Sequence, residues 1–123
     1  MKKIIIAEDE VLTAINHKAK AQKLGFDVLA VVNSGKEAVE KSLALKPDIA
    51  FLDISMEHRS AGIEAAKSIQ QQNKEIKIYF VSAYKKSQYA DEIKNIDYED
   101  FIDKLDFSTR LEAILDNSAS SST

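Results

Sequence analysis

Four short runs of uninterrupted apolar residues recur along this chain, and a longer amphipathic stretch separates each run from the next. The runs are Ile4–Ala7, Val28–Val32, Ile49–Leu52 and Ile78–Val81. None alternates polar and apolar residues, as a strand with one solvent-exposed face would, so each is typical of a central parallel strand covered on both faces. Asp100–Asp103 is a weaker fifth candidate, expected at an edge of the sheet.

The stretches between these runs predict five helices. They are expected over Glu10–Leu24, from Ser34 to a point before Pro47, over about Ala61–Gln72, over Lys85–Asn95, and from Phe107 onward. Gly25 supplies a stop for the first helix, and Ser34 with Glu37 forms a capping box for the second. The first helix is expected to bury Val11, Leu12, Ile15 and Ala19, and the last to bury Phe107, Leu111, Ile114 and Leu115.

Five strand–helix repeats predict a single α/β domain with right-handed crossovers and a doubly wound five-stranded parallel sheet. The length of 123 residues suits one domain, which we expect over residues 1–116. Residues 117–123 are small and polar, and are expected to form a disordered tail or linker stub. The absence of cysteine excludes disulfides and thiolate metal sites.

The charge balance and the first residues narrow the class of partner. Seventeen basic against 20 acidic residues give a net charge of −3, which argues against nucleic-acid binding by this domain. The apolar run near the N-terminus is too short for a signal-peptide core or a membrane span. We therefore expect a cytoplasmic protein without a membrane partner.

Polar side chains follow the predicted strands at their carboxyl ends, where ligands bind in open parallel sheets. Glu8 and Asp9 follow the first strand, Asp53 ends the third, Ser82 ends the fourth, and Lys104 follows the fifth. Clustered carboxylates repel one another, and Mg²⁺, which prefers oxygen ligands, removes that cost. An aspartate can attack phosphorus to form an aspartyl phosphate. The pattern therefore predicts a phosphoryl-transfer site with Asp53 as the acceptor.

Each of these residues also has an ordinary structural explanation. An acidic pair favours a helix N-terminus, an aspartate ends many strands, and a lone lysine is most often a solvated charge. Ser82 would serve as a helix cap and Phe101 as plain core. Only their joint placement favours the site. His17 and His58 are isolated, and we interpret both as surface residues rather than ligands.

These motifs together resemble bacterial response-regulator receiver domains of two-component signalling, from the N-terminus to about Asp116. The matching segments are Glu8–Asp9, Phe51–Met56, Val81–Ala83 and Phe101–Lys104. The resemblance implies a flavodoxin-like receiver fold with strand order 2-1-3-4-5, a sensor histidine kinase or histidine phosphotransfer protein as partner, and a signalling domain rather than an enzyme.

The resemblance also assigns roles to individual residues. Asp53 is the phosphoacceptor, and Asp9, Asp53 and the backbone carbonyl of Ser55 are Mg²⁺ ligands, with Glu8 acting partly through water. Lys104 pairs with the phosphoryl group, while Ser82 and Phe101 are the switch residues. Ser55 and Tyr84 match positions that tune the lifetime of the phosphorylated state. The expected output surface comprises the fourth helix, fifth strand and fifth helix, including Lys85, Lys86, Phe101 and Asp106.

The chain departs from the family pattern in several loops. Leu105 stands where a proline usually follows the lysine, and Glu57 stands where a proline follows Met56. The loop between Asp53 and Gly62 is one residue longer than usual, and residues 96–99 replace a Gly-Ala step before Phe101. None of these changes removes a candidate catalytic group; they affect loop geometry and the partner surface.

Three other functions remain as alternatives. A degenerate receiver would act only as a phosphorylation-independent docking module, which the complete set of site residues disfavours. A Mg²⁺-dependent aspartyl phosphohydrolase commonly has a second aspartate two residues after the nucleophile, where this chain has Ser55. A flavodoxin-type FMN carrier would need a Ser/Thr-rich phosphate loop after the first strand, which is absent.

Overall fold

The computed structural model describes residues 1–121 and contains one five-stranded parallel sheet. Its strands are β1 (Lys3–Ala7), β2 (Asp27–Val32), β3 (Ile49–Asp53), β4 (Lys77–Ser82) and β5 (Asp100–Asp103). Their order is β2-β1-β3-β4-β5, and every neighbouring pair is parallel. The predicted doubly wound topology and the five strands are therefore confirmed. The prediction that Val28–Val32 is a central strand is wrong, because β2 lies at an edge of the sheet and is mostly half-buried.

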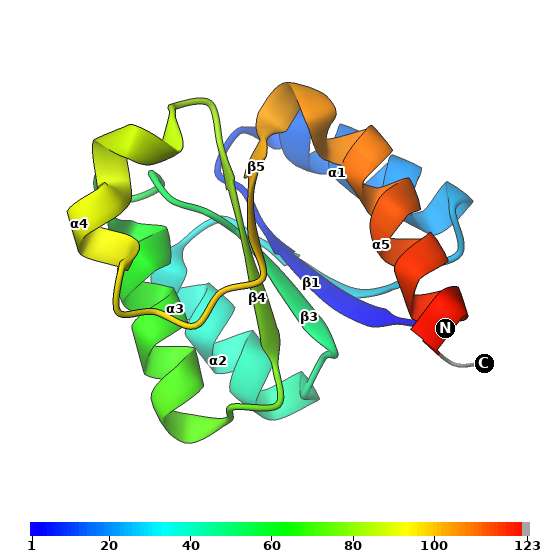
Figure 1. Ribbon diagram of the computed structural model, residues 1–123, viewed down its shortest axis with the longest axis horizontal. Coiled ribbons are helices and arrows are strands. Elements are labelled where there is room, and N and C mark those ends of the chain that lie inside the picture. Colours follow the sequence, from blue (N-terminus) through cyan, green and yellow to red (C-terminus); the bar gives the residue numbers. More distant parts are fainter. Residues whose placement is uncertain (122–123) are drawn as a thin grey trace.

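Helices cover both faces of this sheet (Figure 1). They are α1 (Val11–Lys23), α2 (Gly35–Leu45), α3 (Ala61–Gln72), α4 (Ala90–Ile93) and α5 (Phe107–Ser121), with 3₁₀ turns η1 (Lys86–Tyr89) and η2 (Lys104–Asp106). Helices α1 and α5 lie on one face, and α2, α3 and α4 lie on the other. No helix within residues 1–121 is long and apolar enough to cross a membrane.

Two apolar cores, one on each face, explain why the strands are apolar throughout. Ile5 and Leu52 point into the core under α2, α3 and α4. Ile4 and Phe51 point into the opposite core, where they meet Phe107. Because successive strand residues point to opposite faces, a strand covered on both sides has no position left for a solvated side chain.

The predicted buried face of α1 is wrong. Val11, Leu12 and Ile15 are 70%, 81% and 60% exposed, and Ala19 is also exposed. The helix instead buries three other residues, Ala14, His17 and Ala21. Small side chains at positions 14 and 21 allow the helix to lie close to the sheet, so its larger aliphatic side chains remain on the outside.

His17 is the second correction, because it is buried rather than a surface residue. It is 6% exposed, and its ring stacks on that of Phe107 with the centroids 4.0 Å apart. Phe107 is the first residue of α5 and lies in the core between α1, α5 and the sheet. His17 therefore helps to join α1 to α5. His58, by contrast, is exposed as expected.

The remaining helices agree with the prediction except at the fourth. Ser34 caps α2 by accepting a hydrogen bond from the Glu37 amide at 3.2 Å. The expected continuous helix over Lys85–Asn95 is shorter and divided into η1 and α4. Its first turn is 3₁₀, since the Gln88 amide donates to the carbonyl of Lys85, three residues earlier, at 3.0 Å.

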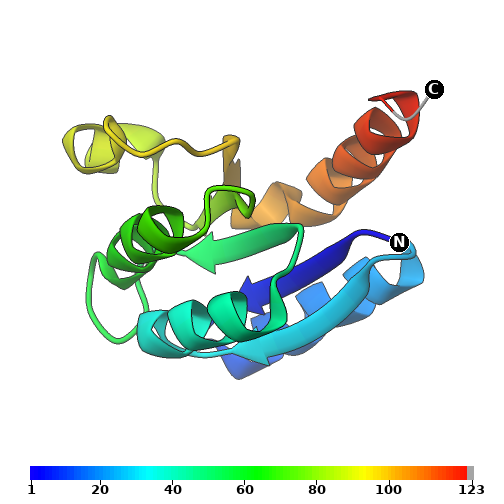
Figure 2. The same cartoon turned by 90° about the horizontal axis from the view of Figure 1, so that it is seen from below.

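Helix α5 buries Phe107, Leu111 and Ile114, as predicted, and its backbone is helical to Ser121. Its C-terminal turns extend beyond the sheet (Figure 2). The helix thus continues through residues 117–121, where the sequence predicts a disordered tail or linker stub; residues 122 and 123 lie outside the described part. The domain boundary at residue 116 stays a prediction.

Candidate functional site

The carboxyl ends of four strands bring the candidate site residues to one edge of the sheet. Ala7 lies opposite Leu52 across the β1–β3 pair, so Glu8 and Asp53 are neighbours. Asp53 pairs in turn with Val81, the residue before Ser82. Continuous parallel pairing therefore gathers groups that are far apart in sequence.

Three carboxylates form a compact cluster at this edge. One oxygen from each of Glu8, Asp9 and Asp53 lies within 4.8 Å of the other two. Glu8 and Asp53 are 3% and 4% exposed, whereas Asp9 is exposed. The cluster therefore has two buried members and one member that faces solvent.

The ammonium group of Lys104 joins this cluster from the end of β5. Its Nζ lies 2.9 Å from Oε1 of Glu8 and 3.1 Å from Oδ2 of Asp53. It also donates to Oε1 of Glu10 at 3.1 Å. Glu10 is a contact that the sequence pattern did not single out, although it lies two residues after Glu8.

The two buried carboxylates retain unused acceptor capacity. Among the residues that the structure describes, Oε1 of Glu8 and Oδ2 of Asp53 accept no hydrogen bond of good geometry. Lys104 offsets them by its charge. Buried acceptors without donors are costly, and a hard divalent cation satisfies carboxylate oxygens of this kind. The donor set therefore fits Mg²⁺, with Glu8, Asp9 and Asp53 as the residues able to hold it.

The pKa values of these groups reflect their burial and mutual repulsion. Burial, together with the nearby Glu8 carboxylate, raises the pKa of Asp53 to about 7. The same two causes raise the pKa of Asp9. For Glu8, burial acts to raise the pKa, but contacts with Lys104, Asp53 and the Glu10 amide together outweigh it and the pKa is lowered. Burial opposes the charge on Lys104, yet its carboxylate contacts raise its pKa overall.

Ser82 and Phe101 lie at different depths near the cluster. Ser82 is 1% exposed, and its hydroxyl accepts a hydrogen bond from the Tyr84 amide at 2.9 Å. Phe101 is half-buried and packs against the core under α4. Ser55 is half-buried in the loop after β3, and Tyr84 is 55% exposed. The ordinary structural explanation for Ser82 was a helix cap. Its hydroxyl instead makes a contact within the turn that follows β4.

The loop between β3 and α3 is fixed by contacts that sequence analysis missed. The Gly62 amide donates to the carbonyl of Ile54 at 2.8 Å, closing the loop at its base. A Cβ added at Gly62 would lie 2.0 Å from the backbone oxygen of Asp53, so glycine is required here. Glu57, the residue in place of the usual proline, accepts from the Gly35 amide at the start of α2.

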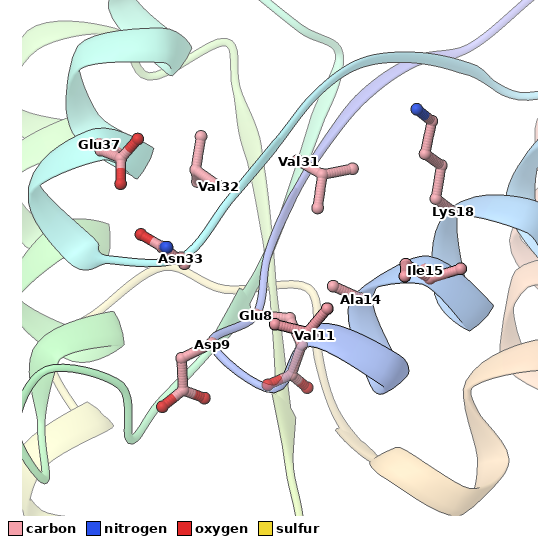
Figure 3. A pocket seen from close by; sticks show the side chains of 10 residues that line it. All are labelled: Glu8, Asp9, Val11, Ala14, Ile15, Lys18, Val31, Val32, Asn33 and Glu37. Atoms are coloured by element: carbon pink, nitrogen blue, oxygen red, sulfur yellow. The ribbon is translucent and has the colours of Figure 1, made fainter.

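A hollow of about 320 Å³ lies beside the acidic cluster, between α1, the end of β2 and the start of α2. Figure 3 shows Glu8 and Asp9 at one end of it, with Lys18 and Glu37 at the other. The lining of this hollow is mainly apolar, and it includes the exposed side chains of Val11 and Ile15. The site therefore adjoins an apolar surface on α1.

Leu105 is exposed on the other side of α1. It is 94% exposed and lines a second hollow together with Thr13, Asn16 and His17. We define the α1 patch as Val11, Leu12, Ile15 and Leu105. All four side chains are apolar and exposed, on or beside the helix that follows the acidic pair.

The sequence and fold match those of known receivers. Chemotaxis protein CheY of Thermotoga maritima is 34% identical over 103 residues, which cover 84% of this chain and 85% of that protein. Transcriptional regulatory protein PdtaR of Mycobacterium tuberculosis is 34% identical over 68 residues, 55% of this chain but only 33% of PdtaR.

A solved structure extends this agreement to three dimensions. It is the N-terminal domain of a response regulator/sensory box/GGDEF 3-domain protein from Carboxydothermus hydrogenoformans, with a TM-score of 0.81 at 27% identity. The alignment covers 94% of this chain and 91% of that one. The sequence model of the family described as response regulator receiver domain matches residues 4–116, and the chain therefore belongs to the response regulator receiver domain family.

Proposed function

We propose that this chain is a phosphoacceptor of a two-component system, with Asp53 as the residue that is phosphorylated. The observation that carries the proposal is the position of Asp53, a carboxylate at a strand end with Lys104 Nζ at 3.1 Å and two further carboxylates around it. The phosphoryl donor of Asp53 is a phosphohistidine on a sensor histidine kinase or a histidine phosphotransfer protein. This chain acts in the cytoplasm.

In the transfer step, a carboxylate oxygen of Asp53 attacks the phosphorus of the donor. The new P–O bond forms as the P–N bond to the imidazole breaks, and the leaving nitrogen takes up a proton. The attacking carboxylate must be ionised, although burial raises the pKa of Asp53 to about 7. The charge of Lys104 favours that ionised form and then pairs with the phosphoryl oxygens.

Asp9, Asp53 and the backbone carbonyl of Ser55 would hold Mg²⁺, with Glu8 acting partly through water, and the ion would supply positive charge to offset the negative charge on the transferring group. The chain itself provides the orientation. Glu8 is held by the amide of Glu10, which donates to its Oε2 at 3.2 Å, and Asp9 stands at the exposed side of the cluster. Breakdown of the aspartyl phosphate is slow self-hydrolysis rather than enzymatic turnover on other substrates.

Phosphorylation changes the switch residues Ser82 and Phe101. The Ser82 hydroxyl, which accepts from the Tyr84 amide, turns to donate to a phosphoryl oxygen. Phe101 is half-buried, so an inward turn would bury more of its ring. A coupling of about 1–3 kcal/mol is sufficient for such a change. The output surface is the α4–β5–α5 face, on which Lys85, Lys86 and Asp106 are exposed.

The α1 patch is the docking surface for the phosphodonor. Val11 and Ile15 line the hollow that Glu8 and Asp9 also line, and Leu105 lines the hollow that Lys104 also lines. Leu12 is exposed on the same helix. An apolar helical face on the partner would cover the patch and bring its phosphohistidine toward Asp53. This assignment gives a function to side chains that lie outside the core.

Titration with beryllofluoride and Mg²⁺, followed by amide chemical shifts, tests the proposal. Beryllofluoride stands in for the phosphoryl group on an aspartate. We expect saturable shifts around Asp53, Ser82 and Lys104 in the wild type, and none of these beryllofluoride-dependent shifts in Asp53→Asn. A wild-type spectrum that does not respond would favour the alternative of a docking module that works without phosphorylation.

A further inference from the structure

The loop over residues 54–60 begins and ends directly on the proposed phosphoacceptor. Its two ends meet where the Gly62 amide donates to the carbonyl of Ile54 at 2.8 Å. An ideal Cβ at Gly62 would lie 2.0 Å from the backbone oxygen of Asp53, so α3 starts in close contact with the end of β3. A displacement of the loop would therefore also displace the backbone beside Asp53.

Glu57 fastens one side of the loop to the start of α2. Its Oε1 and Oε2 accept hydrogen bonds from the Gly35 amide at 2.8 and 2.9 Å, and Oε2 lies 3.4 Å from the amide of Lys36. The first amides of a helix have no partner within it and carry its partial positive charge, so a carboxylate there is favoured. A glycine at position 35 is needed, because a Cβ there would lie 2.7 Å from the carbonyl oxygen of Ala61.

Arg59 fastens the other side of the loop to η1 and α4. Its Nη1 lies 2.7 Å from Oε1 of Glu92, and its Nη2 donates to the carbonyl of Gln88 at 3.1 Å. Its guanidinium carbon lies 4.6 Å from the ring centroid of Tyr89, which is buried. An isolated surface ion pair contributes little, but a guanidinium held by a carboxylate, a carbonyl and an aromatic face has one defined position.

The two anchors lie on opposite sides of the loop and have opposite charge. Ser55, whose backbone carbonyl is a proposed Mg²⁺ ligand, lies between Asp53 and Glu57. The usual proline after Met56 would restrict the backbone here by its ring, and this chain has Glu57 instead. Side-chain anchors at positions 57 and 59 can supply the restriction that the missing ring would have given to a longer loop.

We propose that Glu57 and Arg59 are positioning residues that hold the loop between α2 and α4, so that the carbonyl of Ser55 faces the metal site. This inference rests on the proposed function and adds to it. It makes Mg²⁺ affinity depend on two side chains that touch neither the metal nor the phosphoryl group. Groups that orient a metal ligand in this way typically change metal affinity by a factor of about ten or more.

The test measures Mg²⁺ affinity from amide shifts in four proteins: the wild type, Glu57→Gln, Arg59→Ala and His58→Ala. His58 is the matched control, because it belongs to the same loop and, among the described residues, its side chain forms an ion pair only with Glu64 of α3, at 3.5 Å. We expect about tenfold weaker Mg²⁺ binding for Glu57→Gln and Arg59→Ala, and less than a twofold change for the control. Arg59→Lys, which keeps the charge near Glu92, should recover part of the loss.

The outcomes separate this inference from the function on which it rests. A wild type that binds neither Mg²⁺ nor beryllofluoride would remove the proposed function. A wild type that binds both, with Glu57→Gln and Arg59→Ala equal to it, would overturn the positioning role alone. Arg59 is exposed, so its replacement leaves the fold intact. If the amide spectrum shows that Glu57→Gln is unfolded, the Mg²⁺ affinity of Arg59→Ala alone decides the test.

Discussion

Nζ of Lys104 lies 3.1 Å from Oδ2 of Asp53, although β3, which ends at Asp53, and β5, which ends just before Lys104, do not pair with each other. The lysine reaches across the end of β4, the strand between them. Its ammonium group is therefore close to the Asp53 carboxyl group, whose pKa burial raises to about 7. This contact links the phosphoacceptor to the last strand of the sheet, and several predictions rest on it.

Replacing Lys104 with methionine should separate metal binding from phosphoryl binding. The variant should bind Mg²⁺ several-fold more tightly, because a positive charge within about 5 Å opposes a cation by on the order of 1 kcal/mol. It should bind beryllofluoride more weakly, because the phosphoryl group loses its charge partner. Calorimetric titration of both ligands measures the two effects.

Lys20→Met is the control for this experiment. Lys20 is exposed on α1 and lines the same hollow as Lys104, without an ion pair to the cluster among the described residues. Its replacement should leave both affinities within about twofold. Weaker Mg²⁺ binding in Lys104→Met would show that the lysine supports the metal site instead of opposing it.

The burial of His17 should make the domain less stable in mild acid. Burial lowers its pKa to about 4 from the ordinary value of 6.5, with Lys104 and Lys20 acting in the same direction and Glu8 against them. The unfolded chain takes up a proton near pH 6.5 and the folded chain only near pH 4, so stability falls as the pH falls through this window. The loss amounts to roughly 3 kcal/mol.

Urea unfolding of the wild type and His17→Phe between pH 7 and pH 4 measures this contribution. Phenylalanine keeps an aromatic ring against Phe107 but cannot take up a proton, so the variant should lose less stability across the window. His58→Gln, which changes an exposed histidine, should follow the wild-type curve. Parallel curves for the wild type and His17→Phe would show that His17 takes up its proton as readily in the folded protein as in the unfolded chain.

Gly62→Ala should destabilise the fold and disturb the acceptor at the same time. The new Cβ would lie 2.0 Å from the backbone oxygen of Asp53, so the start of α3 must shift. We expect a loss of at least about 2 kcal/mol in the free energy of unfolding, measured by urea denaturation. Lys67→Ala, at an exposed position of the same helix, should change it by less than about 0.5 kcal/mol.

The central strands β1, β3 and β4 could be predicted from sequence because they are buried on both faces, whereas the edge strands β2 and β5 are mostly half-buried. A residue such as Ile5 has no solvated side, so the apolar run itself marks the element. Polar residues at the carboxyl ends could also be predicted to meet, since parallel pairing aligns those ends. The close approach of Glu8, Asp9 and Asp53 follows from this alignment and is confirmed. The strand order, in contrast, was predicted from the resemblance to receiver domains, and it is also confirmed.

The orientation of α1 could not be predicted by hydrophobicity alone. Its most apolar side chains, including Leu12, face outward, and the sheet is covered by Ala14, His17 and Ala21. These three recur at helical spacing, which was the available signal, but two alanines and a histidine are weak evidence of burial. The anchors made by Glu57 and Arg59 join distant segments, so no local pattern indicates them.

The α1 patch should affect transfer from a protein donor and nothing else. Leu12→Glu places a charge on a side chain that is 81% exposed, so the free energy of unfolding should change by about 0.5 kcal/mol or less. Phosphorylation by a phosphohistidine protein should slow at least several-fold, while phosphorylation by acetyl phosphate should keep its rate. Equal slowing with both donors would place the defect in the site rather than in docking.

Intact-mass spectrometry of the chain after incubation with acetyl phosphate and Mg²⁺ tests the assignment of Asp53 most directly. We predict a gain of one phosphoryl group, located at Asp53 by peptide mapping, that needs the metal and is lost in Asp53→Asn. A wild type that gains no mass, or an Asp53→Asn variant that gains the same mass at the same rate, would contradict the account.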